Sequence, residues 1–173
     1  SHLNDVVTEH LVQMLAREMG VDLERVCWLA FGSEGRSEQT IATDQDNGLV
    51  FAGGTQASWM AFGARVNQLL ADVGYPLCSG LVMAGQAMCC LPLEQWVARF
   101  EHWMAHGSGN DIFAARIYFD VRPLTGQTAL AEPLLDPAGT VKMLQVRLTR
   151  LRATSGQAAL PLFPERRRAT RRR

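Results

Sequence analysis

Two carboxylates two positions apart, Asp44 and Asp46, have the spacing in this 173-residue chain that most directly suggests chemistry. They stand where a polar segment leads into residues 46–51, which are expected to form a strand. Alternate strand residues point to the same face, so both carboxylates should lie on one face. Such a pair is costly unless a cation lies between them, and oxygen ligands suit Mg²⁺ or Mn²⁺. The pair therefore predicts a divalent metal site.

A second polar feature, Gly32-Ser33, follows the apolar run 26–31, which is expected to be a buried strand. Glycine allows the backbone to approach a ligand closely, and the hydroxyl of Ser33 with nearby amides can hydrogen-bond phosphate oxygens. The rest of the segment 33–43 is polar and is expected to be irregular. This end of the strand is therefore a candidate phosphate site.

A third acidic residue, Asp120, stands inside the run 116–121, which is expected to be a strand ended by Pro123. A lone charge in a hydrophobic strand is costly. If this strand lies beside the one that follows Asp44 and Asp46, three carboxylates meet and could hold two metals for in-line attack at phosphorus.

Each of these features also has an ordinary interpretation. Gly-Ser is commonly a turn, Asp-x-Asp is commonly a solvated loop, and Asp120 could be an ion-pair partner of Arg116 or Arg122. Their order along the chain favours the functional interpretation, because a strand, Gly-Ser, an Asp pair and a distant third Asp occur together.

The order Gly32-Ser33 followed by Asp44-x-Asp46 resembles the signature of the DNA polymerase beta nucleotidyltransferase superfamily. More closely, G-S-E-G-R-S-E-Q-T-I-A-T-D-Q-D-N-G-L-V-F is similar to a bacterial family described as nucleotidyltransferases. Its members are usually attached to CBS domains and a cyclic-nucleotide-binding domain, and they are related to the uridylyltransferase that modifies the nitrogen regulatory protein PII. Supporting similarity lies in G-Y-P-L-C at 74–78, in the helix around Trp96 and in Y-F-D-V-R-P-L at 118–124.

By position, this resemblance implies a role for each candidate residue. Gly32 and Ser33 would hold a nucleoside triphosphate, and Arg36 would contact its phosphates, a role that suits a guanidinium. The metal ligands, Mg²⁺ or Mn²⁺ being the cofactor, would be Asp44, Asp46 and Asp120. Asp120 would also activate the acceptor hydroxyl.

The implied activity is transfer of a nucleoside monophosphate from a triphosphate to a hydroxyl, with a protein side chain as one acceptor and signal transduction as the setting. Two alternatives stay open. One is a module that senses a nucleotide without transferring it and reports to attached regulatory domains. The other is nucleic-acid association through the Arg-rich segment 164–173, which is not favoured.

The elements that must position these residues alternate between helix and strand, which indicates an α/β or α+β class. The resemblance implies a nucleotidyltransferase fold, with a small mixed sheet flanked by helices and a helical C-terminal segment. The expected divisions are an N-terminal helix at 1–20, a nucleotidyltransferase domain at 21–135, a C-terminal helix at 136–158 and a basic disordered tail at 159–173. The N-terminal helix is expected to run over 5–19 after Asn4, and further helices are expected at 57–73 and at 93–105, with a short strand at 81–84.

Composition limits the remaining classes. The 17 basic and 17 acidic side chains balance over the whole chain. Residues 1–141, however, carry 7 basic and 16 acidic groups, whereas residues 142–173 carry 10 basic groups and one acidic group. No run reaches the roughly 20 apolar residues that span a bilayer, so no membrane association is expected. The four cysteines form no C-x-x-C pair, which predicts reduced, mostly core cysteines in a cytoplasmic protein.

Overall fold

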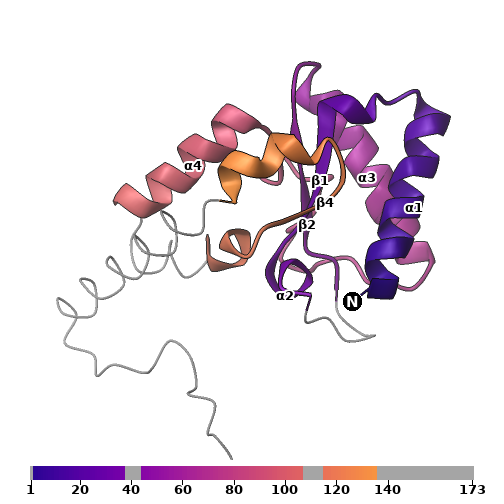
Figure 1. The fold of residues 1–173 in the computed structure, drawn as a ribbon. Coiled ribbons are helices and arrows are strands. Elements are labelled where there is room, and N and C mark those ends of the chain that lie inside the picture. Colours follow the sequence, from indigo (N-terminus) through magenta and orange to yellow (C-terminus); the bar gives the residue numbers. More distant parts are fainter. Residues whose placement is uncertain (1, 38–43, 107–114, 136–173) are drawn as a thin grey trace, which may run out of the picture.

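The computed structural model describes residues 2–37, 44–106 and 115–135, and these form a mixed sheet between two layers of helices (Figure 1). The sheet has the order β3-β2-β1-β4. Its strands are β1 (Val26–Ala30), β2 (Asn47–Phe51), β3 (Cys90–Pro92) and β4 (Arg122–Gly126). The central strand β1 is antiparallel to both β2 and β4, and β2 is parallel to β3. The expected mixed sheet flanked by helices is confirmed.

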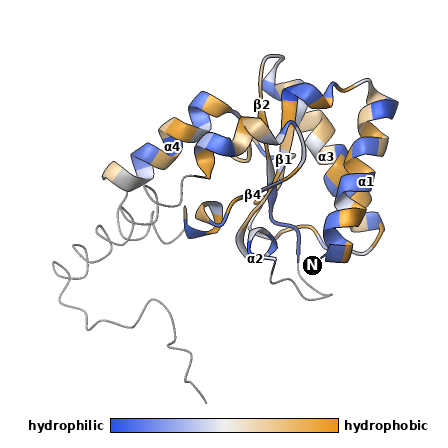
Figure 2. Ribbon diagram, in the orientation of Figure 1, coloured by the Kyte–Doolittle hydropathy of each residue, from blue (hydrophilic) through white to orange (hydrophobic). Residues whose placement is uncertain are grey.

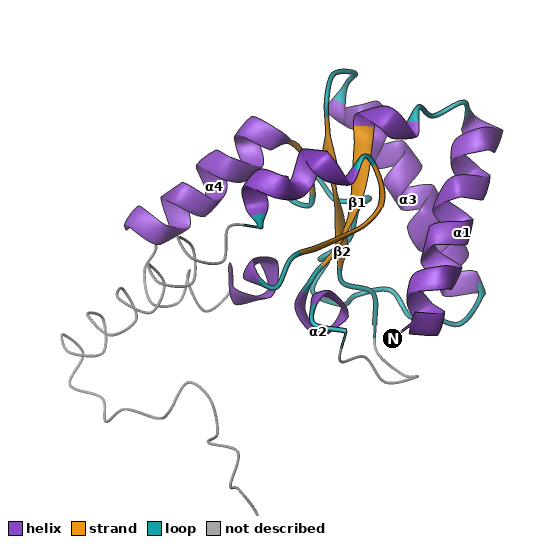
Figure 3. Cartoon of the chain, viewed as in Figure 1, coloured by secondary structure: helices purple, strands orange, loops and turns teal. Residues whose placement is uncertain are grey.

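Helices cover both faces of this sheet (Figure 3). One face carries α1 (His2–Met19) and α3 (Gln56–Asp72). The opposite face carries α4 (Leu93–His106) and the 3₁₀ helix η2 (Thr128–Leu134). Two short elements flank β1, namely the 3₁₀ helix η1 (Leu23–Arg25) and the single-turn helix α2 (Gly32–Gly35).

Strand β1 is apolar throughout because it is covered on both faces. Val26 and Trp28 pack toward α1 and α3, whereas Cys27, Leu29 and Phe31 pack toward α4 and η2. Figure 2 shows the matching hydrophobic stripes on the helices. The sheet is therefore the middle of two cores, and its ends are left to present polar groups.

The predicted helices agree with the structure to within a few residues. Thr55 caps α3 with its side chain, which accepts a hydrogen bond from the Ser58 amide, and Gly74 (φ 104°) follows the helix end. The exception is the start of α1, which begins at His2, so Asn4 lies in the first turn and not at the cap. Its side chain instead accepts a hydrogen bond from the Tyr75 hydroxyl at 3.1 Å.

The expected strand at 81–84 is wrong, and the strand on this side of the sheet is β3. Leu81 closes a turn by donating its amide to the Cys78 carbonyl, and it has φ 58°. The segment makes one strand-like bond, from the Asn47 amide to the Val82 carbonyl at 3.0 Å. The Asn47 side chain then takes the Ala84 amide at 2.9 Å, so a ladder cannot continue.

The expected strand at 116–121 is also wrong. Residues 115–119 are helical, Asp120 lies in a bend, and β4 follows with Pro123 inside it. Proline is tolerated there because β4 is an edge strand. The apolar side chains of 117, 118, 119 and 121 all pack against the core beside α4, which strand alternation would not allow.

The predicted C-terminal helix at 136–158 and basic tail at 159–173 lie outside the described residues. None of the helices within the described part of the chain combines the length and the apolar character needed to cross a membrane.

Candidate functional site

The loop that leaves β1 depends on glycine at its first position. Gly32 has φ 53°, a conformation that L-residues rarely adopt, and a Cβ there would lie 2.9 Å from Ile117. The short helix α2 starts at this residue, so the irregular structure expected from residue 33 onward is wrong for residues 33–35. It brings Ser33 and Arg36 to the same side of the sheet end.

Asp44 and Asp46 precede β2, which begins at Asn47, so the strand alternation expected for them does not apply. What orients them is a buried amide network beneath. Asn67 of α3 donates to Gln45 Oε1 and to Asn47 Oδ1, both at 2.8 Å. Because Gln45 and Asn47 are drawn inward and buried, the acidic residues beside them face the other way.

The same segment is fixed against the loop that follows α3. The Gln45 amide donates to the Pro76 carbonyl at 2.9 Å, and the Asn47 amide donates to the Val82 carbonyl at 3.0 Å. The Gln45 side chain adds a bond to the Tyr75 carbonyl at 2.9 Å. Buried networks whose members are all satisfied hold their surroundings rigidly. The backbone on either side of Asp46 is thus held in place.

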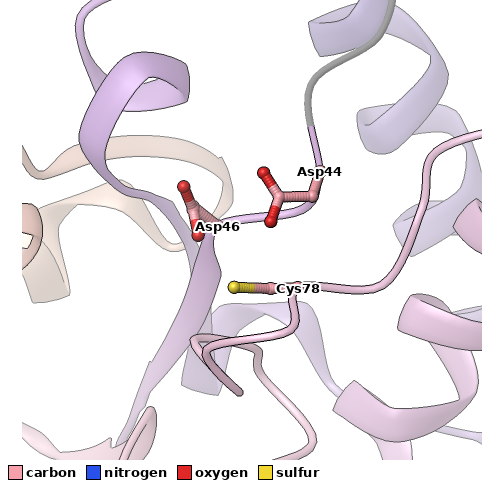
Figure 4. Close-up of side chains that lie close together, drawn as sticks. All are labelled: Asp44, Asp46 and Cys78. Atoms are coloured by element: carbon pink, nitrogen blue, oxygen red, sulfur yellow. The ribbon is translucent and has the colours of Figure 1, made fainter.

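The two carboxylates come together with a cysteine that sequence reasoning assigned to the core. Ligand atoms of Asp44, Asp46 and Cys78 all lie within 4.8 Å of one another. Figure 4 shows their side chains converging, Cys78 from the loop between α3 and β3. Asp44 is the most exposed of the three, Asp46 is half-buried, and Cys78 is 7% exposed. The group therefore runs from solvent inward.

Burial raises the pKa of the Asp46 carboxyl, and the nearby charge of Asp44 raises it further, whereas a hydrogen bond with Cys78 lowers it. Burial also raises the pKa of the Cys78 thiol, although the backbone of Val82 opposes the change. Cys78 is thus a neutral thiol that donates to Asp46.

This donor set fits a divalent cation. Asp44 and Asp46 offer the oxygen atoms that Mg²⁺ and Mn²⁺ prefer, and a cation removes the repulsion that raises the pKa of Asp46. The neutral thiol takes no place among hard ligands and acts there as a hydrogen-bond donor.

A further buried carboxylate, Glu34, lies behind the pair. It is 6% exposed, and its Oε2 accepts a hydrogen bond from the Asp46 amide at 3.4 Å. Burial raises the pKa of Glu34 to about 7, an increase to which the charges of Asp46 and Asp5 contribute. The sequence signal for it was its place inside the G-S-E-G motif, but no role followed from that motif.

Replacing Glu34 by Gln should make stability less dependent on pH. The folded pKa of Glu34 is raised from 4.5 to about 7, so the stability it contributes is fully present below pH 4.5 and is lost as pH rises toward 7. Gln keeps the acceptor for the Asp46 amide without the charge. In urea unfolding without metal, the stability gained by Glu34→Gln should be about 2 kcal/mol larger at pH 8 than at pH 5. If Glu34→Gln changed the free energy of unfolding equally at pH 5 and pH 8, the raised pKa of Glu34 would be contradicted.

One cavity of about 230 Å³ joins most of the predicted site residues. Its lining is Gly32, Ser33, Arg36, Asp46, Arg116, Ile117 and Asp120. Sequence reasoning gave Arg116 no part in the site, and no motif marked it. The cavity therefore brings the candidate phosphate-binding residues, one candidate metal ligand and the third acid to one place.

Asp120 does not belong to the Asp44–Asp46–Cys78 group; its carboxylate forms an ion pair with Arg36. Its alternative partner Arg122 is engaged elsewhere, with Asp5 at 2.9 Å. Arg122 also donates to the carbonyls of Glu34 at 3.0 Å and Gly35 at 3.2 Å. Arg122 thus ties α2 to α1 and β4, while Arg36 links Asp120 to the end of α2.

Comparison with known proteins is consistent with this geometry. No curated protein and no solved structure matches the chain significantly. Residues 1–110 match the model of a family described as Putative nucleotidyltransferase DUF294, which implies a nucleoside triphosphate substrate and a divalent metal. The matched part contains β1, α2, the Asp44–Asp46 segment and Cys78 but ends before Asp120. Since the match covers more than half of the 173 residues, the chain belongs to the DUF294 nucleotidyltransferase family.

Proposed function

We propose that this chain transfers a nucleoside monophosphate from a nucleoside triphosphate to a hydroxyl acceptor, with pyrophosphate as the leaving group. The observation that carries the proposal is that a single cavity is lined by five of the six residues proposed for the site. They are Gly32, Ser33, Arg36, Asp46 and Asp120. The sixth, Asp44, is within 4.8 Å of Asp46, measured between ligand atoms.

The cavity suits the phosphate groups of the substrate. At about 230 Å³ it is smaller than the roughly 300–1,000 Å³ of pockets that enclose whole ligands. Ser33 supplies a hydroxyl and Arg36 and Arg116 supply guanidinium groups, which recognise phosphate oxygens well. In this proposal the triphosphate enters the cavity and the nucleoside stays outside it.

Asp44 and Asp46 would hold the divalent cations at the edge of this cavity. Bound there, the cations offset the charge of the phosphate oxygens and make the acceptor hydroxyl easier to deprotonate. Asp120 would accept the proton of that hydroxyl. Asp120 now forms an ion pair with Arg36. When Arg36 binds the phosphates, this ion pair would break and the carboxylate of Asp120 could accept the proton.

The acceptor we favour is a hydroxyl of a protein side chain, and the setting a signalling pathway in which regulatory domains act with residues 21–135. The family relationship with a protein-modifying uridylyltransferase supports this choice by analogy alone. Leu81 and Met88, in the segment between α3 and β3, have exposed apolar side chains, and we assign these two to contact with the acceptor.

A nucleotide-sensing module without transfer is the second candidate. The observation that favours it is the pairing of Asp120 with Arg36, which leaves the third carboxylate outside the group formed by the other two. A sensor needs the phosphate loop and a metal but no base for the acceptor.

Triphosphates labelled at the α-phosphate test both candidates. With Mg²⁺ and candidate acceptor proteins, we expect label on the acceptor and release of pyrophosphate, and neither with the Asp44→Ala/Asp46→Ala variant. Label transfer that is equal in the variant would exclude the proposed transferase. Calorimetric binding of nucleotide that depends on Mg²⁺, without turnover on any acceptor, would favour the sensor.

A further inference from the structure

Cys78 is held opposite Asp46 by the way two backbone segments run together. The carbonyls of Pro76 and Val82, on either side of Cys78, accept the amides on either side of Asp46 at 2.9 and 3.0 Å. The turn from Cys78 to Leu81 closes the segment between them. These bonds hold the backbone of Cys78 opposite Asp46, so the thiol needs only a side-chain rotation to reach the carboxylates.

The donor atoms of this group are of two chemical kinds. The sulfur of Cys78 and the carboxylate oxygens of Asp44 and Asp46 lie within 4.8 Å of one another. Figure 4 shows the thiol directed toward the carboxylates. Cys78 is only 7% exposed to solvent. In a tetrahedral site with metal–sulfur and metal–oxygen distances of about 2.3 and 2.1 Å, the donors are about 3.5 Å apart. Small side-chain movements are enough to reach this spacing.

We propose that Cys78 Sγ joins Asp44 and Asp46 as the third protein ligand of a thiophilic divalent cation such as Zn²⁺ or Co²⁺. Solvent would reach the group at Asp44, the most exposed of the three, and supply the remaining ligand as water. This inference goes beyond nucleotidyl transfer, because it concerns which metal ions the carboxylate pair binds. It applies whether or not the chain is an enzyme.

Binding of the ion replaces the thiol proton of Cys78 with the metal. When the ion binds, the S–H bond of Cys78 breaks, its proton leaves to solvent, and a sulfur–metal bond forms in place of the hydrogen bond to Asp46. Mg²⁺ takes oxygen ligands and keeps several waters, so it leaves the thiol protonated. Zn²⁺ and Co²⁺ accept a thiolate. The two kinds of ion therefore use the same carboxylates in different ligand sets, and a thiophilic ion excludes Mg²⁺.

Cobalt titration of the whole chain without nucleotide tests the assignment. Thiolate ligation of Co²⁺ gives a sulfur-to-metal charge-transfer band in the near ultraviolet. We expect this band in the unaltered chain and in Cys89→Ala, which removes a buried cysteine of the same loop outside the group. We expect no band in Cys78→Ser. The Zn²⁺ affinity of Cys78→Ser should fall by at least about tenfold, while its Mg²⁺ affinity stays unchanged.

A band that persists in Cys78→Ser, or that is missing from the unaltered chain, would overturn the proposal. Should Cys78→Ser fail to fold, Asp46→Asn gives a second test: its Co²⁺ affinity should also fall by at least about tenfold, and unchanged affinity would overturn the proposal equally. Since these readings need no triphosphate and no turnover, a failure of the proposed transfer reaction would leave them unaffected.

Discussion

Replacing Asp46 or Asp44 by Asn should lower the rate of nucleotidyl transfer by at least about a thousandfold. In the proposed reaction each variant would lose a charged oxygen ligand of the cations. Their stabilisation of developing charge is worth several kcal/mol, and each 1.36 kcal/mol is about tenfold in rate. Single-turnover transfer from an α-labelled triphosphate measures the rate. Calorimetry of Mg²⁺ binding should show a parallel loss of affinity.

Measurements of unfolding distinguish a metal-binding role of Asp46 from a purely structural one. Burial and the charge of Asp44 raise the pKa of Asp46, so its ionised form weakens the metal-free fold at neutral pH. Asp46→Asn should therefore unfold at the same urea concentration as the unaltered chain or a higher one. Asp72→Asn, at an exposed position on α3 outside the cavity, is the matched control and should keep full activity. A variant Asp46→Asn that retains the activity of this control would falsify the proposed metal role.

Gly35→Ala should disturb the site through the backbone. A Cβ at Gly35 would lie 1.7 Å from the backbone oxygen of Asp120 and 3.2 Å from that of Ala30. Both neighbours are main chain, so α2 and the bend at Asp120 must move apart. Overpacking of this kind costs about 1–3 kcal/mol or more. Urea unfolding should show that loss, and the ion pair between Arg36 and Asp120 should weaken with it.

Gly80→Ala is the control for this change, because its Cβ would meet only the Cys78 sulfur at an ordinary 3.5 Å. We expect Gly80→Ala to unfold like the unaltered chain, and only Gly35→Ala to lose Mg²⁺-dependent nucleotide affinity. If the two variants had equal unfolding free energies, the close packing of α2 against Asp120 would be excluded.

Local patterns were enough to predict much of this fold. The helices α3 and α4 follow from apolar residues at helical spacing, and β1 and β2 follow from short apolar runs that stop at polar segments. These signals are local because a helix or strand buried on one face has apolar residues at a regular spacing, and one buried on both faces is a continuous apolar run. The Gly32-Ser33 and Asp44-x-Asp46 pairs could be found in the same way, since the first follows such a run and the second precedes one.

Other parts could not be read locally. Residues 116–121 alternate like a strand, but their aromatic side chains gain more by packing together on the core beside α4, and that core is built from distant segments. The segment 81–84 looks like a strand because it is apolar, yet Asn47 takes the amide that would extend a ladder. In both cases a tertiary contact outweighs the local preference.

The same division holds for the site. The family and the residue types can be found from the sequence alone: a Gly-Ser loop, two carboxylates just before a strand, and a third acid. The partners of these residues follow from the folded structure. It placed Cys78 against the carboxylate pair, buried Glu34 behind it, and paired Asp120 with Arg36. Residue types and their order are properties of the chain itself, whereas the orientation of Asp44 and Asp46 and the distances between segments depend on backbone bonds and packing formed only when the sheet and its helices assemble.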